Sequence, residues 1–369
     1  MEIIDKTLSI PPAFHERAKK DTGQLYFDIE STGLNKQRSY VYLLGALWWE
    51  DGQYRLRQYF AEKPADEKEI LESFFDLCSA FDCIVHYNGD SFDLPYIRHR
   101  AAYYDLVCRL PGSSLDLYRH YSPLKKLLKA EDLKLTTLEA FAGYERRDRH
   151  TGKELIKVYD RYLQTGDALL KEKLLLHNYD DLAGLIWLQR LYSLLAMKNK
   201  ELKPRDIKAV ADMKHRNLTL ICFYDGLSFP EGLSWEAEGI KIRCTDGGSK
   251  AADGFSVSLL IPFYEGRLYH YFKDYKNYYY LPAEDRALHK SVAMYVDAGA
   301  REKAKKETAY VPKEGLFLPQ FKELHKPAFR RKGDPASRLY FLYEDAFSDD
   351  PERLKDYAVH MIAEVGKRI

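Results

Sequence analysis

Two carboxylates interrupt the apolar segment LYFDIESTGL, residues 25–34, and this feature constrains the fold more than any other. Burying a charged group is costly unless it is paired or bound to a metal ion. Side chains two positions apart on a strand point to the same face, so a strand here directs Asp28 and Glu30 to one side of a sheet. The two acids therefore either lie at the exposed edge of a strand or hold a cation together.

The residues that follow predict a mixed sheet flanked by helices. Gly52 lies in the turn of a hairpin, and beyond it strand-like and helix-like segments alternate, which is typical of an α/β domain. Apolar residues recur at helical spacing in the segments assigned to helices. The expected strands cover 25–30, 40–49, 53–62, 82–88 and 115–117, and the expected helices cover 66–80, 123–129, 136–142, 155–163 and 167–196, with another from about 93.

The length of 369 residues favours two domains. We expect a first domain over 1–196, a polar linker over 197–216, and a smaller α+β domain over 217–369. In this second domain the expected strands cover 218–224, 240–244, 255–263 and 267–272, and the expected helices cover 283–296, 300–309 and 351–367.

The balance of charges excludes a globally basic surface. The net charge is +1, from 57 basic and 56 acidic residues, so binding to phosphates would depend on local patches. No run approaches the ~20 apolar residues of a membrane span, and the first residues lack the layout of a signal peptide. Five scattered cysteines without a CxxC pair indicate neither a disulfide framework nor a zinc site. A cytoplasmic protein without membrane attachment is the simplest interpretation.

Two further acidic motifs belong to the expected first domain. In HYNGDSFDLPYI, residues 86–97, a strand leads through a loop to Asp93 at the start of a helix, where the helix dipole favours a carboxylate. In LLLHNYDDLAGL, residues 174–185, His177 and Asp181 are four apart and share one helical face. An N-cap role for Asp93 and a structural role for His177 are the alternatives.

Two other acids near these motifs have plainer interpretations. Asp180 is rotated by about 100° from Asp181 on a helix, so we expect it at the surface. Asp116 ends a short strand, and it is either a supporting acid of the site or the cap of the next helix.

The segments FDIESTGL, YNGDSFDLPYIRHRA and HNYDD together resemble the three exonuclease motifs of the DEDD (DnaQ-like) superfamily, whose fold is ribonuclease-H-like. The middle motif is also similar to that of family B DNA polymerase proofreading domains. The YprB-like ribonuclease-H-like family is the closer match, because SSLDLYRHY, LTTLEAFAGYERRDRHTG and YDRYLQTGD occur in the same order. The resemblance covers about residues 23–193, and it places a histidine, His177, at the four-residue spacing of the superfamily's tyrosine subclass.

The resemblance implies a two-metal nuclease, most simply a 3′ to 5′ exonuclease acting on single-stranded or frayed DNA or RNA. Asp28, Glu30, Asp93 and Asp181 would bind two Mg²⁺ or Mn²⁺ ions. His177 would be the general base. A non-catalytic nucleic-acid-binding module on the same scaffold is the alternative function.

Possible substrate contacts follow from the same motifs, each with a plainer alternative. Thr32 follows the first motif, and Asn88 either holds its loop or touches substrate. Phe92 packs beneath a terminal base or only in the core. Arg146 and Arg147 contact phosphates or are solvated loop charges.

The second domain carries an aromatic segment, residues 263–282, with seven tyrosines and two phenylalanines. Rings interleaved with Arg267, Lys273 and Lys276 would suit the stacking of single-stranded bases. Tyrosine and phenylalanine also simply favour strands, so nucleic-acid binding and an ordinary sheet both remain open.

Overall fold

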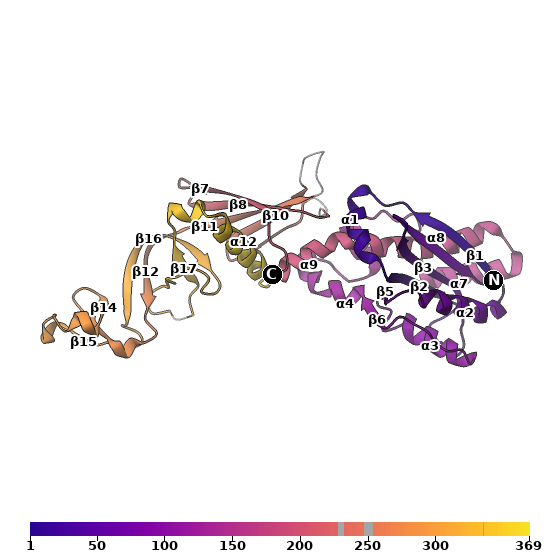
Figure 1. The fold of residues 1–369 in the computed structure, drawn as a ribbon, viewed down its shortest axis with the longest axis horizontal. Coiled ribbons are helices and arrows are strands. Elements are labelled where there is room, and N and C mark those ends of the chain that lie inside the picture. Colours follow the sequence, from indigo (N-terminus) through magenta and orange to yellow (C-terminus); the bar gives the residue numbers. More distant parts are fainter. Residues whose placement is uncertain (228–231, 247–253, 335) are drawn as a thin grey trace. The chain divides into compact units, whose positions relative to one another are not determined.

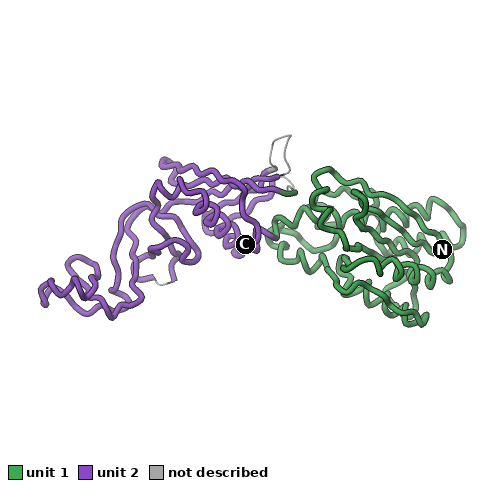
Figure 2. Tube along the Cα trace, viewed as in Figure 1, with its two compact units in different colours: residues 1–195, 226–230, 251–253 green, residues 196–225, 231–250, 254–369 purple. Residues whose placement is uncertain are grey.

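The computed structural model describes residues 1–227, 232–246, 254–334 and 336–369, which form two compact units (Figures 1 and 2). Unit 1 is built mainly on residues 1–195, and unit 2 on most of residues 196–369. Within these described ranges, no helix is both long enough and apolar enough to cross a bilayer.

Unit 1 contains a six-stranded mixed sheet in the order β1-β4-β3-β2-β5-β6. Strands β1, β4, β3 and β2 pair antiparallel, and β5 and β6 continue the sheet parallel to β2. This sheet and its helices form the architecture expected from the sequence. The strands are β1 (Glu2–Leu8), β2 (Gln24–Ser31), β3 (Val41–Glu50), β4 (Gln53–Phe60), β5 (Cys83–His86) and β6 (Ser113–Asp116).

Strand β1 is the one strand of this sheet that we did not expect. It pairs only with β4 at the edge of the sheet, and Leu8 is its one buried residue. An edge strand with so little burial carries almost no alternation of polar and apolar residues, so its sequence gives no periodic signal.

The longest helix of unit 1, α8, contacts β2 and β3 and also packs against α6 and α7. It ends at Trp187, and a short 3₁₀ turn then leads into α9, so the single helix expected over 167–196 is interrupted. The helices are α1 (His15–Ala18), α2 (Glu67–Cys78), α3 (Asp93–Tyr103), α4 (Leu117–Tyr121), α5 (Lys125–Leu128), α6 (Leu135–Ala142), α7 (Gly152–Thr165), α8 (Ala168–Trp187) and α9 (Tyr192–Lys198).

Strand β2 separates the core from the polar face of the sheet. Phe27 is buried and packs on Phe74 of α2, with ring centroids 5.6 Å apart. Because side chains alternate along a strand, Asp28 and Glu30 point to the opposite face, where α8 lies. The alternation expected from the sequence therefore directs the two acids to α8, on the face opposite α2.

Helix α8 approaches the sheet closely at Gly45, which lies opposite Asp28 on β3. A Cβ atom at Gly45 would overlap the side-chain oxygen of Asn178 and lie 2.7 Å from a methyl group of Leu182. Asn178 is fully buried, donates to Asp28 Oδ2 at 3.0 Å, and accepts from Gln58 Nε2 at 2.9 Å. The absence of a side chain at Gly45 therefore sets the distance between α8 and β2.

Unit 2 is built on antiparallel sheets. On β8, β10 and β11 alternate residues are buried, and α12 contacts β7, β8 and β9 across the larger sheet. The three sheets have the orders β7-β8-β11-β10-β9, β12-β16-β17 and β14-β13-β15. The elements are β7 (Asp206–Asp212), β8 (Asn217–Tyr224), β9 (Ser234–Ala237), β10 (Ile240–Asp246), β11 (Phe255–Pro262), β12 (Tyr264–Tyr271), β13 (Tyr278–Leu281), β14 (Arg286–His289), α10 (Lys290–Ala293), β15 (Glu302–Lys303), β16 (Tyr310–Gln320), β17 (Leu339–Leu342), α11 (Asp345–Ser348) and α12 (Pro351–Gly366).

Two helices expected in unit 2 are wrong. Residues 283–296 instead form β14 and the short α10, and the helix-like composition of 300–309 contributes only the two-residue strand β15. Pairing with β13 decides both outcomes, since this strand lies between β14 and β15. Tertiary pairing here overrides local helix propensity.

Part of the segment expected as a linker also has regular structure. Residues Asp206–Asp212 form β7, an edge strand paired with β8. Three of its seven residues are charged and only Ile207 is buried, which is why the segment resembles a linker. The domain boundaries expected from the sequence stay a proposal.

Replacing Gly45 with alanine should destabilise unit 1, because the added methyl group must displace Asn178 or Leu182. Overpacking of this kind costs typically about 1–3 kcal/mol, so we expect a lower melting temperature by circular dichroism. Gly112→Ala is the matched control, since a Cβ at Gly112 meets nothing within 4 Å. Equal melting temperatures for the two variants would contradict the close approach of α8.

Candidate active site

Four carboxylates meet between the sheet and α8. Asp28 and Glu30 come from β2, Asp93 is the first residue of α3, and Asp181 lies on α8. Burial, followed by the charges of Asp181 and Glu30, raises the pKa of Asp28 well above its ordinary value. The structure thus brings together the four acids that the three sequence motifs supply.

Glu30 and Asp93 have raised pKa values as well. Burial raises the pKa of Glu30 to about 8; the charge of His177 opposes this effect and that of Asp181 adds to it. Burial also raises the pKa of Asp93 to about 7, although a backbone hydrogen bond from Ile29 favours its ionised form. These acids repel one another, so a cation placed among them would relieve a large electrostatic cost.

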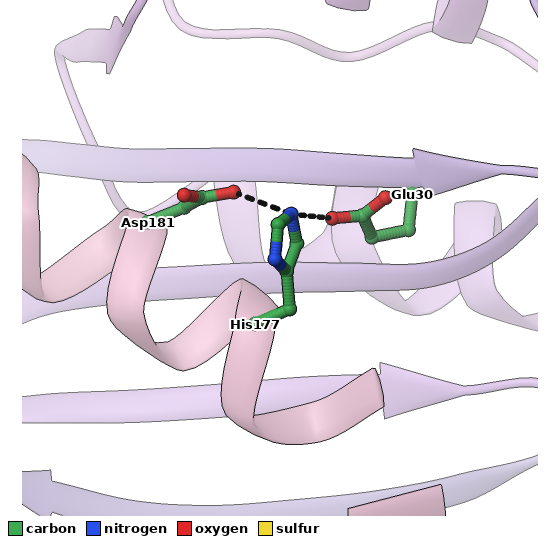
Figure 3. Close-up of side chains that lie close together, drawn as sticks. All are labelled: Glu30, His177 and Asp181. Carbon is green, nitrogen blue, oxygen red and sulfur yellow. Dashed lines mark ion pairs between the residues drawn. The ribbon is translucent and has the colours of Figure 1, made fainter. Parts of the chain in front are cut away.

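His177 lies between two of these acids, as Figure 3 shows. Its Nε2 atom is 3.3 Å from Glu30 Oε1 and 3.4 Å from Asp181 Oδ2. Burial lowers the pKa of His177, but the charges of Asp181 and Glu30 and the hydrogen bond to Asp148 together raise it above its ordinary value. The four-residue spacing on α8 therefore directs the imidazole to the carboxylates.

The donor atoms of this cluster fit a divalent cation. One ligand atom each from Glu30, His177 and Asp181 lies within 4.8 Å of the others. Carboxylate oxygens are the ligands that Mg²⁺ and other hard divalent ions prefer. Burial, together with the charges of neighbouring acids, raises the pKa values of Asp28, Glu30 and Asp93, and such ions would offset this cost.

Asp180 is buried, and its expected location at the surface is therefore wrong. It is fully buried and accepts hydrogen bonds from the Tyr144 hydroxyl at 2.8 Å and from the backbone N–H groups of Arg147 and Asp148 at 2.8 and 2.7 Å. The loop between α6 and α7 covers this face of α8. Helical periodicity on α8 contains no information about that loop.

Asp148 is a residue of the site that sequence reasoning missed. It lies in the same loop, is 6% exposed, and places its Oδ2 atom 2.6 Å from Nδ1 of His177. The segment LTTLEAFAGYERRDRHTG carried the only sequence signal, since it is one of the segments behind the family resemblance. Nothing in its local pattern distinguishes Asp148 from an ordinary loop acid.

The two arginines of this loop have different environments. Arg146 Nη1 lies 2.6 Å from Asp181 Oδ1 and 3.1 Å from Glu139, and its side chain is largely buried. The Arg147 side chain is 63% exposed, and its guanidinium lies over the Tyr179 ring. Arg146 is therefore tied to a candidate metal ligand, and Arg147 faces solvent.

Polar groups at the ends of β5 and β6 hold the loop that leads to Asp93. Asn88 has a left-handed backbone, with φ 58°, and its N–H donates to Asp116 Oδ1 at 2.8 Å. Asp116 also caps α4 by accepting from the N–H of Tyr118, so it is a helix cap that in addition holds the loop before Asp93. His86 accepts from the N–H of Gly89 through Nδ1, so this loop is fixed at two points.

Thr32 and Phe92 have structural partners as well. The Thr32 hydroxyl accepts from the N–H of Tyr40 at 3.1 Å, which closes the loop after β2. Phe92 precedes α3 and packs against the core, with its ring centroid 5.3 Å from that of Tyr96. Their direct contact with a substrate stays a prediction, as it does for Asn88.

Comparison with known proteins finds a superfamily model that matches part of the chain. Residues 25–194 match the family model of the RNase_H superfamily. This part of the chain is a ribonuclease-H-like domain. The match confirms the fold expected for the first half of the chain, and the domain contains all four acids and His177.

Individual proteins are similar to smaller parts of the chain. A DNA polymerase of Methanocaldococcus jannaschii is 30% identical over 114 residues; the match covers 26% of this chain and only 7% of the polymerase. The family B DNA polymerase of Pyrobaculum calidifontis aligns with a TM-score of 0.39 and 20% identity over 48% of this chain and 25% of that one. E. coli exonuclease I, in complex with a dT13 oligonucleotide, aligns with a TM-score of 0.31 and 12% identity over 54% and 55% of the two chains.

Neutralising Glu30 should stabilise the protein when divalent ions are chelated. The folded state keeps a proton on Glu30 up to a pKa of about 8, whereas the unfolded chain releases it near 4.5, so stability falls as the pH rises between these values. Glu30→Gln removes this loss, and we expect its melting temperature at pH 8 to rise by at least about 2 °C, which corresponds to roughly 1 kcal/mol.

The same variant should lose part of the stabilisation that Mg²⁺ or Mn²⁺ gives the wild type, because one ligand is gone. Asp160→Asn, an exposed acid on α7, is the matched control and should behave like the wild type in both conditions. A Glu30→Gln variant that melts below the wild type in chelator would contradict the repulsion inferred among the acids.

Proposed function

We propose that this protein is a metal-dependent nuclease, most simply a 3′ to 5′ exonuclease that hydrolyses single-stranded or frayed DNA or RNA. The observation that carries this proposal is the meeting of four carboxylates and a histidine from three separate segments on a ribonuclease-H-like domain. The superfamily match supports a nuclease, and the 3′ to 5′ direction rests on the resemblance of the motifs. The cytoplasmic setting expected from the composition is part of the proposal.

The four acids would hold the cofactor. Two Mg²⁺ or Mn²⁺ ions bound by Asp28, Glu30, Asp93 and Asp181 would lower the pKa of an attacking water and stabilise the leaving oxygen of the phosphodiester. Asn178 keeps Asp28 in place through its hydrogen bond, and α3 holds Asp93 at its first turn. These contacts fix the orientation of the acids before a substrate arrives.

His177 would take the proton of the attacking water. Its Nε2 atom faces Glu30 and Asp181, and its Nδ1 atom is occupied by Asp148, so Nε2 is the nitrogen available to a water in the site. Attack of this water on the terminal phosphodiester would release a nucleoside 5′-monophosphate and leave a new 3′-hydroxyl on the strand. General-base catalysis of this kind contributes typically about 10²–10⁴-fold to a rate.

Substrate contacts belong to the same proposal. The exposed guanidinium of Arg147 is available to a backbone phosphate, and Arg146 would contact the strand only by giving up part of its pairing with Asp181. Thr32, Asn88 and Phe92 would lie along the strand end, beside their structural partners.

Unit 2 would add affinity for the strand. A pocket of about 500 Å³ in this unit is lined by aromatic and charged side chains. Phe272 stacks on Tyr278 with ring centroids 4.0 Å apart, which fixes one aromatic wall. Aromatic faces beside cations suit unpaired bases of any sequence. The residues of this pocket include Tyr271, Phe272, Lys273, Tyr275, Lys306 and Arg330.

Asp28→Asn and Asp93→Asn should abolish cleavage while leaving the fold intact, because each removes a candidate metal ligand. Cleavage is measured with Mg²⁺ or Mn²⁺ on DNA and RNA strands labelled at either end, with chelator and Asp160→Asn as controls. The position of the label on the products reports the direction of cutting. Cleavage by the two variants at the wild-type rate would exclude this site, and strand binding without cleavage by the wild type would favour the binding module.

Tyr275→Ala should weaken strand binding by unit 2 if a base stacks in the pocket. Loss of one stacked base costs about 1–3 kcal/mol, so we expect roughly a 5- to 150-fold weaker affinity for a labelled oligonucleotide in chelator. Tyr295→Ala removes a more exposed tyrosine ring that lies outside the pocket lining and serves as the control. Unchanged affinity in Tyr275→Ala would remove this pocket from the proposal.

A further inference from the structure

Asp148 is the partner of the His177 Nδ1 atom, and the contact has the geometry of a strong hydrogen bond. The distance of 2.6 Å between Nδ1 and Asp148 Oδ2 is in the range of charge-assisted bonds. The Asp148 carboxylate is buried, so water cannot readily compete for it. This bond is on the far side of the imidazole from the two acids Glu30 and Asp181.

The position of Asp148 is itself fixed by helix α8. Asp180 lies three residues after His177 on this helix and accepts the backbone N–H groups of Arg147 and Asp148, at 2.8 and 2.7 Å. The Tyr144 hydroxyl donates to the same carboxylate, so three donors hold one end of the loop on α8. The histidine and the support of its partner are therefore anchored to the same helical turn.

His150 completes the arrangement around Asp148. Its backbone N–H donates to Oδ2 at 3.1 Å, and its Nδ1 lies 2.7 Å from Oδ1. Both carboxylate oxygens therefore have partners, and the side chain is held in one orientation. Such outer partners commonly decide the tautomer and the ring orientation of a functional histidine.

We propose that Asp148 is a positioning residue of the nuclease site: its carboxylate accepts a hydrogen bond from the Nδ1–H group of His177 and so presents the unprotonated Nε2 atom to the water. This inference rests on the proposed function and adds to it a residue that neither the motifs nor the superfamily match assigns. Asp180 acts one step further out, because it fixes the backbone that carries Asp148. Asp148 touches neither the substrate nor the reacting atoms.

The position of His177 on a helix explains why its ring needs a second partner. His177 is on a regular helix, so its backbone is rigid and only rotation of the side chain can turn the imidazole away from the acids. The bond to Asp148 opposes that rotation. The helix thus directs the side chain of His177 toward the acids, and the bond to Asp148 keeps the ring in that orientation.

The test is a double-mutant cycle between positions 148 and 177. Asp148→Asn and Asp148→Ala are made in the wild type and in His177→Ala, and the rate of single-turnover cleavage, KM and the half-saturating Mg²⁺ concentration are measured. We expect each change at Asp148 to lower the rate by about 10- to 100-fold with little change in KM or in the Mg²⁺ requirement. In the His177→Ala background the same changes should have less than about a twofold effect, because Asp148 acts through the histidine.

The controls separate positioning from stability. Glu145→Gln removes one negative charge from an exposed residue of the same loop and should keep the wild-type rate. Asp148→Glu keeps the carboxylate and should recover part of the rate. Melting temperatures identify any variant that fails to fold, and the cycle is then decided by the other substitution at position 148.

Each outcome has one meaning. Additive losses in the cycle, or equal losses in rate and Mg²⁺ affinity, would show a general structural role and overturn the inference while the nuclease assignment stands. A fully active His177→Ala variant would also overturn it. A wild type that cleaves neither DNA nor RNA with either ion would overturn the proposed function, and the role of Asp148 with it.

Discussion

The close crossing of α8 over β2 and β3 is the contact on which the candidate site depends. Gly45 leaves room for Asn178, and Asn178 joins the helix to Asp28 on one side and to Gln58 on the other. With the helix held at this distance, His177 reaches Glu30, and Asp181 joins the acids of the sheet. A side chain at position 45 would have to displace Asn178 or Leu182 on the helix that carries His177 and Asp181.

Adjacent residues on one part of α8 contact different parts of the fold. Successive side chains on a helix point in directions about 100° apart, so neighbours in the sequence meet different parts of the fold. Asn178 packs under the sheet, His177 and Asp181 face the acids, and Asp180 holds the loop of Asp148. The segment HNYDD is thus a set of separate contacts around one helix, and the two consecutive aspartates do different things.

The four acids repel one another, and each has its own neighbour that offsets part of the repulsion. Because the pKa values of Glu30 and Asp93 stay raised, these neighbours offset only part of the cost. Bound cations would relieve the electrostatic cost that remains. Functional sites commonly carry such a cost in stability. The pairs are Asp28 with Asn178, Glu30 with His177, Asp93 with the backbone of Ile29, and Asp181 with Arg146.

The sequence predicts the parts of this arrangement that local patterns control. Alternation along β2 places Asp28 and Glu30 on one face, and the i, i+4 relation places His177 beside Asp181. The burial of Asp148 and Asp180 was not predicted, because it depends on how a loop folds over a helix that is distant from it in the sequence. The helices expected over 283–296 and 300–309 failed for a related reason, since pairing with β13 overrode local propensity.

The tie between Asp180 and the loop of Asp148 has a consequence for how the protein responds to heat. Loops commonly open with smaller free energies than the strands of a core, and the 144–150 segment contains neither helix nor strand, unlike the part of the chain that holds Asp28 and Glu30. The orientation of the His177 imidazole is therefore lost when this segment opens. Moderate warming would disorder the orientation of His177 while the cation ligands on β2 remain in place, which separates the loss of catalysis from the loss of metal binding.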